Sequence, residues 1–115
     1  MMIAGFIVQG TSTQTVVVNV AGPSLAGLLA VPLRDPTLEL VRQSDGVVLK
    51  TNDNWFIQDI PADVAAITAS GFQPNDGREP AIIATLPPGA YTAIVRGAGG
   101  TTGLAVVAVY EVDRP

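Results

Sequence analysis

The residue types best suited to chemistry gather in the stretch TNDNW at residues 51–55. The side chains of Asn52, Asp53 and Asn54 carry oxygens of the hard kind that calcium binds, and Asp76 in the polar segment 73–80 could complete the set. Their spacing does not fit the loop of an EF-hand. Asn and Asp side chains also bond to their own backbone in polar turns. Two interpretations therefore stay open: a calcium site, with further ligands from Asn75 or Asp45, and a self-capped turn.

Two aromatic side chains follow at once. Trp55 and Phe56 stand side by side in the same segment, and Trp55 is the only tryptophan. Aromatic side chains on a loop can stack on a sugar ring or hold a protein partner. Trp55 could equally cover one end of the core, where Phe72 would meet it. Arg78 and Glu79, in the segment 73–80, are expected to be solvated charges. The recognition residues predicted here are Trp55, Phe56 and Arg78.

The sequence offers few groups for catalysis, and a hydrolase built on paired carboxylates is the one catalytic hypothesis that it leaves. The chain has no histidine and no cysteine, which removes the commonest general base and the thiolate nucleophile. Ser24 does not stand in a nucleophile elbow. Asp59 and Asp63 flank the start of an expected helix, where the helix dipole favours acidic residues. We therefore predict that the chain is not an enzyme, and calcium is the only cofactor that its residues suggest.

The charge distribution excludes several partners. The net charge is −4 and the six basic residues are spread singly, whereas nucleic acids and anionic membranes require a clustered basic face. No apolar run approaches the length of a membrane span. The opening residues lack the basic region of a signal peptide, so the signal of a secreted protein would lie outside this chain. Protein partners, including other copies of the chain, remain.

The pattern of apolar residues predicts one all-β domain over residues 1–115. Turn residues recur every eight to twelve positions over much of the chain, and Asp45-Gly46 is a strong hairpin turn. This spacing is typical of an antiparallel β-sandwich of the jelly-roll-like kind. Seven strands are expected, at residues 3–8, 14–22, 37–43, 47–51, 81–86, 90–97 and 103–112.

Two other segments complete the expected fold. Pro61, Asp63 and Gly71 frame one short helix near residues 61–70, with Val64 and Ile67 facing inward. Residues 22–36 form a long connection whose leucines, Leu25, Leu28 and Leu29, would plug the end of the core. The glycine-rich segment 97–103 has no lysine after it and is expected to be a hairpin tip rather than a phosphate loop.

Several strands are apolar at consecutive positions, notably residues 16–18, 82–83 and 105–110. In a two-layer sandwich the outer face of each strand should be polar. Either the helix and the long connection cover these faces, or the domain packs against neighbours. The sequence leaves both open.

The motifs DPTLELVRQSDGVVLKTNDNW at 35–55 and LPPGAYTAIV at 86–95 resemble those of bacterial pre-peptidase C-terminal domains and of the related collagen-binding domains of clostridial collagenases. The whole-chain pattern IAGFxV, GPSL, DPxLxL and NDNW is more similar to tandem modules near the C-termini of large secreted bacterial proteins. The positions that match the pre-peptidase and collagen-binding pattern are Asp35, Leu38, Leu40, Asp45, Gly46, Leu86, Pro87, Gly89, Tyr91, Val95 and Gly103.

The resemblance implies an antiparallel jelly-roll-like sandwich that is extracellular or on the bacterial cell surface. It also implies an accessory role in binding, adhesion or stabilisation, with calcium bound in some members. Collagen binding does not carry over, because the acidic N-terminal linker is missing and the only tyrosines are Tyr91 and Tyr110. The alternative is a structural subunit that self-assembles into a fibre or surface layer through apolar sheet faces and edge strands.

Overall fold

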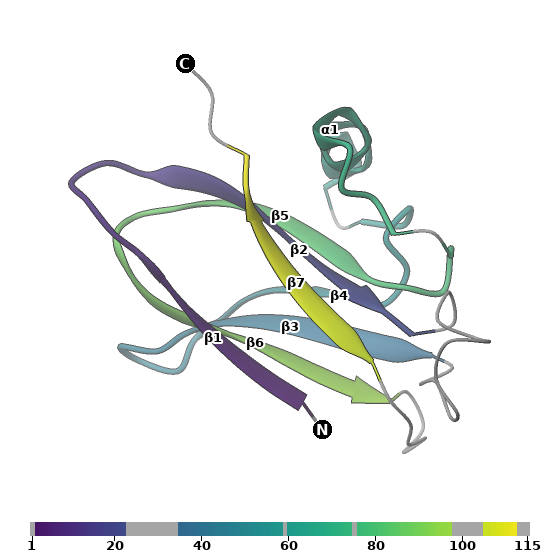
Figure 1. Ribbon diagram of the computed structural model, residues 1–115, viewed down its shortest axis with the longest axis horizontal. Helices are drawn as coiled ribbons and strands as arrows, with labels where there is room; N and C mark the ends of the chain where they lie inside the picture. Colours follow the sequence, from purple (N-terminus) through teal and green to yellow (C-terminus); the bar gives the residue numbers. More distant parts are fainter. Residues whose placement is uncertain (1, 23–34, 59, 75, 98–104, 113–115) are drawn as a thin grey trace.

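The computed structural model describes residues 2–22, 35–58, 60–74, 76–97 and 105–112 (Figure 1). The expected leucine plug at 25–29 and most of the glycine-rich tip at 97–103 lie outside these residues. The described elements are seven strands and one helix: β1 (Met2–Val8), β2 (Gln14–Ala21), β3 (Pro36–Arg42), β4 (Val48–Asn52), α1 (Ala62–Ser70), β5 (Ala81–Leu86), β6 (Gly89–Gly97) and β7 (Val106–Glu111).

The strands form two antiparallel sheets that face each other. One sheet has the order β1-β6-β3-β4 and the other β5-β2-β7. Among the described strands, β3 and β4 are the one consecutive pair that shares a sheet, and every other step along the chain changes sheet. The predicted fold class, an all-β antiparallel sandwich with seven strands and a short helix, is confirmed.

Alternating side chains from both sheets fill the space between them. In β3 the buried positions are Pro36, Leu38 and Leu40, and in β6 they are Tyr91, Ala93 and Val95. This is the alternation expected of a strand with one face on the core and one toward solvent. The Tyr91 hydroxyl, which would otherwise be a costly buried polar group, donates to the Pro87 carbonyl oxygen at 2.6 Å.

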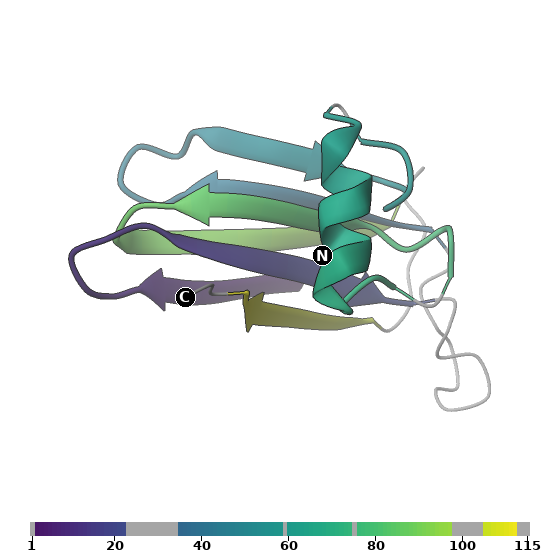
Figure 2. The ribbon, with the colours of Figure 1, turned by 90° about the horizontal axis from the view of Figure 1, so that it is seen from above.

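The consecutive apolar positions of β2 and β5 have a second core behind them. Val17 and Ile83 point away from the sandwich interior and pack with Ile67 of α1, and Trp55 and Phe72 lie against the same cluster. Figure 2 shows α1 lying across the β5-β2-β7 sheet. The chain's own helix and aromatic side chains thus cover the outward-facing apolar residues of β2 and β5, whereas Val106 of β7 stays 51% exposed. The long connection lies outside the described residues.

The helix begins and ends where the sequence places it. Pro61 precedes its first residue, Asp63 lies in its first turn, and Gly71 closes it in the left-handed conformation with a φ of 81°. That φ favours glycine, because a Cβ would clash with the following carbonyl group. The expectation that Ile67 faces inward is confirmed, whereas Val64 is only half-buried. No helix in the described residues is long and apolar enough to cross a membrane.

Candidate functional site

The predicted calcium residue Asn52 is the last residue of β4 and is almost completely buried. Its side-chain oxygen accepts a hydrogen bond from the Ala81 N–H at 3.1 Å, and its side-chain nitrogen donates to the Ile57 carbonyl oxygen at 2.9 Å. Both polar atoms therefore fix the loop 53–57 to the start of β5. The contacts favour the structural interpretation of this residue.

A buried carboxylate ties the same loop to its neighbours. The Glu79 side chain is fully inaccessible, and its two oxygens accept hydrogen bonds from the Gly22 N–H at 2.7 Å and the Asp76 N–H at 3.1 Å. The Glu79 main-chain oxygen accepts the Trp55 N–H at 3.0 Å. The expectation of a solvated Glu79 is therefore wrong, because the Gly22 and Asp76 amides supply hydrogen bonds that its buried charge requires.

Asp76 and Arg78 form an ion pair within the segment 73–80. The Arg78 guanidinium donates from Nε and Nη2 to the two Asp76 oxygens at 3.0 and 2.9 Å, and the Arg78 N–H adds a bond of 2.9 Å to Asp76 Oδ1. These hydrogen bonds and the adjacent positive charge hold the pKa of Asp76 below its usual value. The oxygens predicted to bind calcium are thus engaged by a cation that belongs to the chain.

Asp53 has a carboxylate neighbour that the sequence did not suggest. Partial burial and then the charge and hydrogen bond of Asp35 raise the pKa of Asp53. In the described residues, no group of three or more acidic side chains is gathered to hold a metal ion. Asn54 contributes its main-chain oxygen to a turn, where it accepts the Ile57 N–H at 2.9 Å. A cation at this loop would have Asp53 and Asp35 as its charged ligands.

Asp45 lies too far from Asn52 and Asp53 to bind the same cation. It lies in the turn between β3 and β4, where the Arg42 guanidinium binds its carboxylate at 2.6 Å. The strand β4 separates this turn from Asn52, and five residues of strand span about 16 Å. The expectation that Asp45 adds a ligand to the 52–54 loop is wrong for this geometric reason.

The raised pKa of Asp53 makes a prediction about pH. A carboxylate whose pKa is higher in the folded than in the unfolded chain weakens the fold when it is ionised, and the loss is recovered as the pH falls through that raised pKa. Asp53→Asn should therefore raise the Tm at pH 7, by about 1–4 °C for a solvent-exposed pair. The gain should vanish near pH 3, below the unfolded pKa of about 3.9.

Asp45→Asn is the matched control for Asp53→Asn. Hydrogen bonds from Arg42 and then from the Val47 N–H hold the pKa of Asp45 below its usual value. Its replacement should therefore leave the Tm at pH 7 unchanged or lower it. Thermal melts of both variants at pH 7 and pH 3 check the signs, and a lower Tm for Asp53→Asn at pH 7 would contradict the repulsion.

The predicted recognition residues lie in the loops that follow β4 and precede β5, and they differ in exposure. Trp55 is half-buried against the cluster that Val17, Ile67 and Ile83 form beneath α1, in accord with a covering role. Phe56 is 51% exposed and stands edge-on to Trp55, with a centroid distance of 6.3 Å. The Phe56 ring rests on Gly77, where an added Cβ would come within 2.8 Å of it. Phe56 and Arg78 are the members of the predicted set that a partner could reach.

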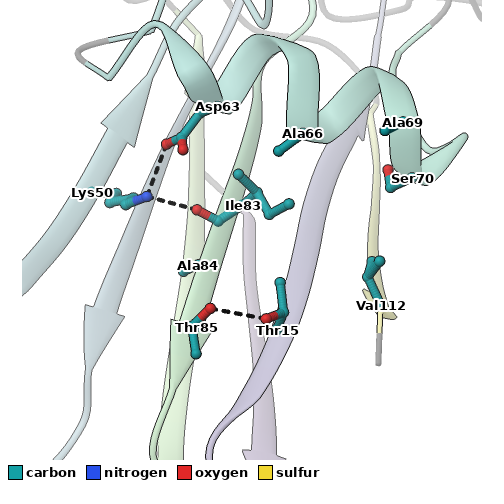
Figure 3. A pocket seen from close by; sticks show the side chains of 10 residues that line it. All are labelled: Thr15, Lys50, Asp63, Ala66, Ala69, Ser70, Ile83, Ala84, Thr85 and Val112. Atoms are coloured by element: carbon teal, nitrogen blue, oxygen red, sulfur yellow. Dashed lines mark hydrogen bonds and ion pairs between the residues drawn. The ribbon is translucent and has the colours of Figure 1, made fainter. Parts of the chain in front are cut away.

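A pocket beneath α1 was not predicted. Its volume is about 670 Å³, which is within the range of small-molecule sites. The helix supplies Asp63, Ala66, Ala69 and Ser70, and the floor consists of Ile83, Ala84, Thr85, Thr15 and Val112, with Lys50 at one end (Figure 3). Small side chains on one helix face leave the space open. Alanine and serine residues in a short helix do not predict a pocket, because the pocket depends on where the helix packs on the sheet.

Lys50 closes the end of this pocket. Its ammonium group donates to the Asp63 carboxylate at 2.9 Å and to the Ile83 carbonyl oxygen at 2.7 Å. It thereby joins β4, α1 and β5. Since β4 and β5 belong to different sheets, Lys50 also bridges the two sheets on that side of the sandwich.

The β4–β5 side of the sandwich is closed by side chains. Besides Lys50, the Gln58 side chain donates to the Ala81 carbonyl oxygen at 2.9 Å, and Asn52 accepts the Ala81 N–H. The free edge of β5 is therefore capped at residues 81 and 83. An inward-pointing charge and covering side chains are devices that block strand addition at a sheet edge.

The opposite side of the sandwich has no such cover in the described residues. There β1 and β7 are the edge strands of their sheets, and Figure 2 shows them together at the side away from β4. β1 carries no charged residue and no proline, and β7 carries one charge, Glu111. Ile3, Ile7 and Val106 are 59%, 68% and 51% exposed. We call this the open side.

Comparison with protein-family models, with curated proteins and with solved structures found no match to this chain.

Proposed function

We propose that the chain is a non-catalytic β-sandwich module of a secreted or cell-surface bacterial protein, and that it works by binding protein chains at its open side. The observation that carries the proposal is the contrast between the two sides of the sandwich. One side is closed by Lys50, Asn52 and Gln58, and the other presents edge strands that none of the described residues covers. Bare, apolar edges are the surfaces that pair with another chain.

Partly exposed core residues strengthen the proposal. On the inner face of the open side, Phe6 of β1 and Val107 and Val109 of β7 pack against the main core yet stay half-exposed. A protein segment that seated itself on this side would cover them. Removing this apolar surface from water favours association, and part of the gain offsets the entropy lost on binding.

The polar side chains support a non-catalytic role. Lys50 is held by Asp63 and a carbonyl oxygen, Asp76 is held by Arg78, and Glu79 is buried among backbone amides. Each of these groups serves a contact within the fold. The extracellular location rests on the resemblance to secreted bacterial modules.

Sedimentation velocity of the 115-residue chain between about 10 µM and 1 mM tests the proposal. We expect the weight-average mass to rise above 11.8 kDa with concentration. The double variant Ile3→Lys/Val106→Lys places a charge on each open edge and should remain monomeric, because charged edge residues oppose strand pairing.

Thr51→Lys/Ala65→Lys is the control, since it adds the same charge at exposed positions away from the open side. It should associate like the wild type. A wild-type chain that stays monomeric at 1 mM would refute self-association at the open side. Equal weakening by both double variants would show that charge alone, and not its place, opposes association.

A second candidate function follows from the pocket beneath α1. Its apolar lining residues, with two threonine hydroxyls and the Lys50–Asp63 ion pair beside them, suit a compact amphipathic molecule. The apolar sulfonate 8-anilinonaphthalene-1-sulfonate is a suitable fluorescent probe. Ala66→Phe fills the pocket and should abolish binding of the probe, whereas Ala65→Phe, outside the lining, should not. Equal binding by both variants would exclude this pocket as the probe site.

A further inference from the structure

We propose that two copies of the chain pair β1 with β1, antiparallel, about a two-fold axis that passes beside Gly5. The result is one continuous eight-stranded sheet made from the two four-stranded sheets. This inference rests on the proposed function, and it names the partner as a second copy and fixes the register of contact.

The ladder of hydrogen bonds shows which backbone groups of β1 are free to pair. The Gln43 N–H donates to the Ala90 carbonyl oxygen at 3.1 Å, so Ala90 turns its backbone groups toward β3. Successive residues of a strand turn these groups to opposite sides. Tyr91, Ala93 and Val95 therefore turn theirs toward β1, where their partners are Phe6, Ala4 and Met2. It follows that the outward-facing groups of β1 belong to Ile3, Gly5 and Ile7.

These three residues are arranged symmetrically about Gly5. In an antiparallel pair centred there, Ile3 faces Ile7 of the partner subunit, Gly5 faces Gly5 of the partner subunit, and Ile7 faces Ile3 of the partner subunit. All are outward-facing on both strands, so each pair can exchange two hydrogen bonds, about six in total. Shifting the register by two residues loses one of the three pairs. The sequence of β1 is thus self-complementary in this register, as an isologous contact requires.

Side chains match on both faces of the paired strands. On the outer face the two most exposed isoleucines, Ile3 and Ile7, become cross-strand neighbours. On the inner face Phe6, which stacks on Tyr91 at 5.7 Å, lies opposite the small Ala4 of the partner subunit. No charge is buried, because Met2–Val8 contains none. Pairing β7 with β7 would instead bring two copies of Glu111 into the contact.

The size of the contact sets its strength. Seven residues of strand span about 23 Å, and a contact of one strand pair falls short of the roughly 1,000 Å² typical of stable complexes. We therefore expect a reversible dimer with a Kd of about 10 µM to 1 mM. Tethering several modules in one protein would strengthen such a contact through effective concentration.

Charge exchange on the two isoleucines tests the pairing in solution. Ile3→Lys/Ile7→Lys and Ile3→Glu/Ile7→Glu each place like charges opposite one another in the homodimer, and each should weaken dimerisation tenfold or more in sedimentation equilibrium. An equimolar mixture places lysine opposite glutamate and should restore dimers, in salt-sensitive form. Each variant alone should keep the circular dichroism and the cooperative melt of the wild type, since both positions are exposed.

A cysteine at the axis tests the register. The chain has no cysteine, and a Cβ at Gly5 meets nothing closer than 3.8 Å. Hydrogen-bonded partners have Cα atoms about 5.5 Å apart, which a disulfide can span. Gly5→Cys should therefore cross-link into dimers under mild oxidation. Thr92→Cys, on β6 beside Gly5, is the control, because three strand spacings of about 4.8 Å separate its copies.

The outcomes separate the register from the broader proposal. Restored dimers in the mixture together with selective cross-linking of Gly5→Cys support the two-fold β1 pair. The β1 pair is overturned if the wild type associates, the charge variants associate equally well, and Gly5→Cys cross-links no better than Thr92→Cys. Binding at the open side would then still stand. A wild type that stays monomeric at about 1 mM overturns the β1 pair and any self-association at the open side.

Discussion

Glu79→Ala should lower the Tm by more than 10 °C and leave the loops at its end of the sandwich open to proteolysis. The substitution removes the acceptors of the Gly22 and Asp76 amides, and hydrogen bonds to a charged group contribute about 1.5–3 kcal/mol each. A loss of about 3–6 kcal/mol is a large share of the stability of a small domain, and each kcal/mol corresponds to roughly 4 °C for a chain of this size. Thermal melts and limited proteolysis measure the effect.

Glu111→Ala is the matched control, because this residue is exposed near the end of β7. It should change the Tm by about 2 °C or less. Glu79→Gln should fall between the two, since the amide keeps one acceptor and turns an NH₂ group toward the other amide donor. A Glu79→Ala chain as stable as Glu111→Ala would show that the carboxylate does not hold the loops together.

Asn52→Leu should lower the Tm by about 8–24 °C. The leucine side chain is similar in volume but leaves the Ala81 N–H and the Ile57 carbonyl oxygen without their partner, at about 1–3 kcal/mol for each buried group. Asn54→Leu is the control, because Asn54 contributes a main-chain contact that the substitution keeps. It should be nearly neutral.

Thermal melts also decide whether residues 52–54 form a calcium site or a self-capped turn. A ligand that binds only the folded chain raises its Tm, and chelation removes that gain. Since Asn52 and Asp76 are engaged within the chain, we expect the wild-type Tm to be the same with 5 mM calcium and with excess chelator. A fall of several degrees with chelator would instead assign an ion to Asp53 and Asp35.

The strands and the helix could be predicted because their signals are local. The alternation of Leu38 and Leu40 with polar residues, the Asp45-Gly46 turn, and Gly71 after the helix each act within a few residues. The doubly apolar strand β2 could not be resolved from the sequence, because its second face depends on where α1 and Trp55 pack. That packing joins residues about fifty positions apart.

The candidate site was harder to predict for the same reason. Residue type alone groups Asp76 with Asn52, Asp53 and Asn54, whereas the cation that binds Asp76, Arg78, is two positions away in the sequence. Glu79 looked like a solvated charge because its amide partners, Gly22 among them, come from distant loops. Lys50 fell within a strand pattern and gave no sign that it bridges β4 to β5. These roles depend on contacts between residues that are far apart in the sequence, and a single sequence does not show which of them meet.

The pairing of β1 with β6 has a consequence for how the chain is made. Met2 lies opposite Val95, so β1 has no partner in its own sheet until β6, much later in the domain, has been synthesised. At about 5–20 residues per second, this apolar segment waits for several seconds beyond the tunnel. The sandwich must also close many long loops before its contacts form, which places its folding in the millisecond-to-second range. During that interval β1 is the segment most in need of a chaperone, and variants that unpair it should be lost first in the cell.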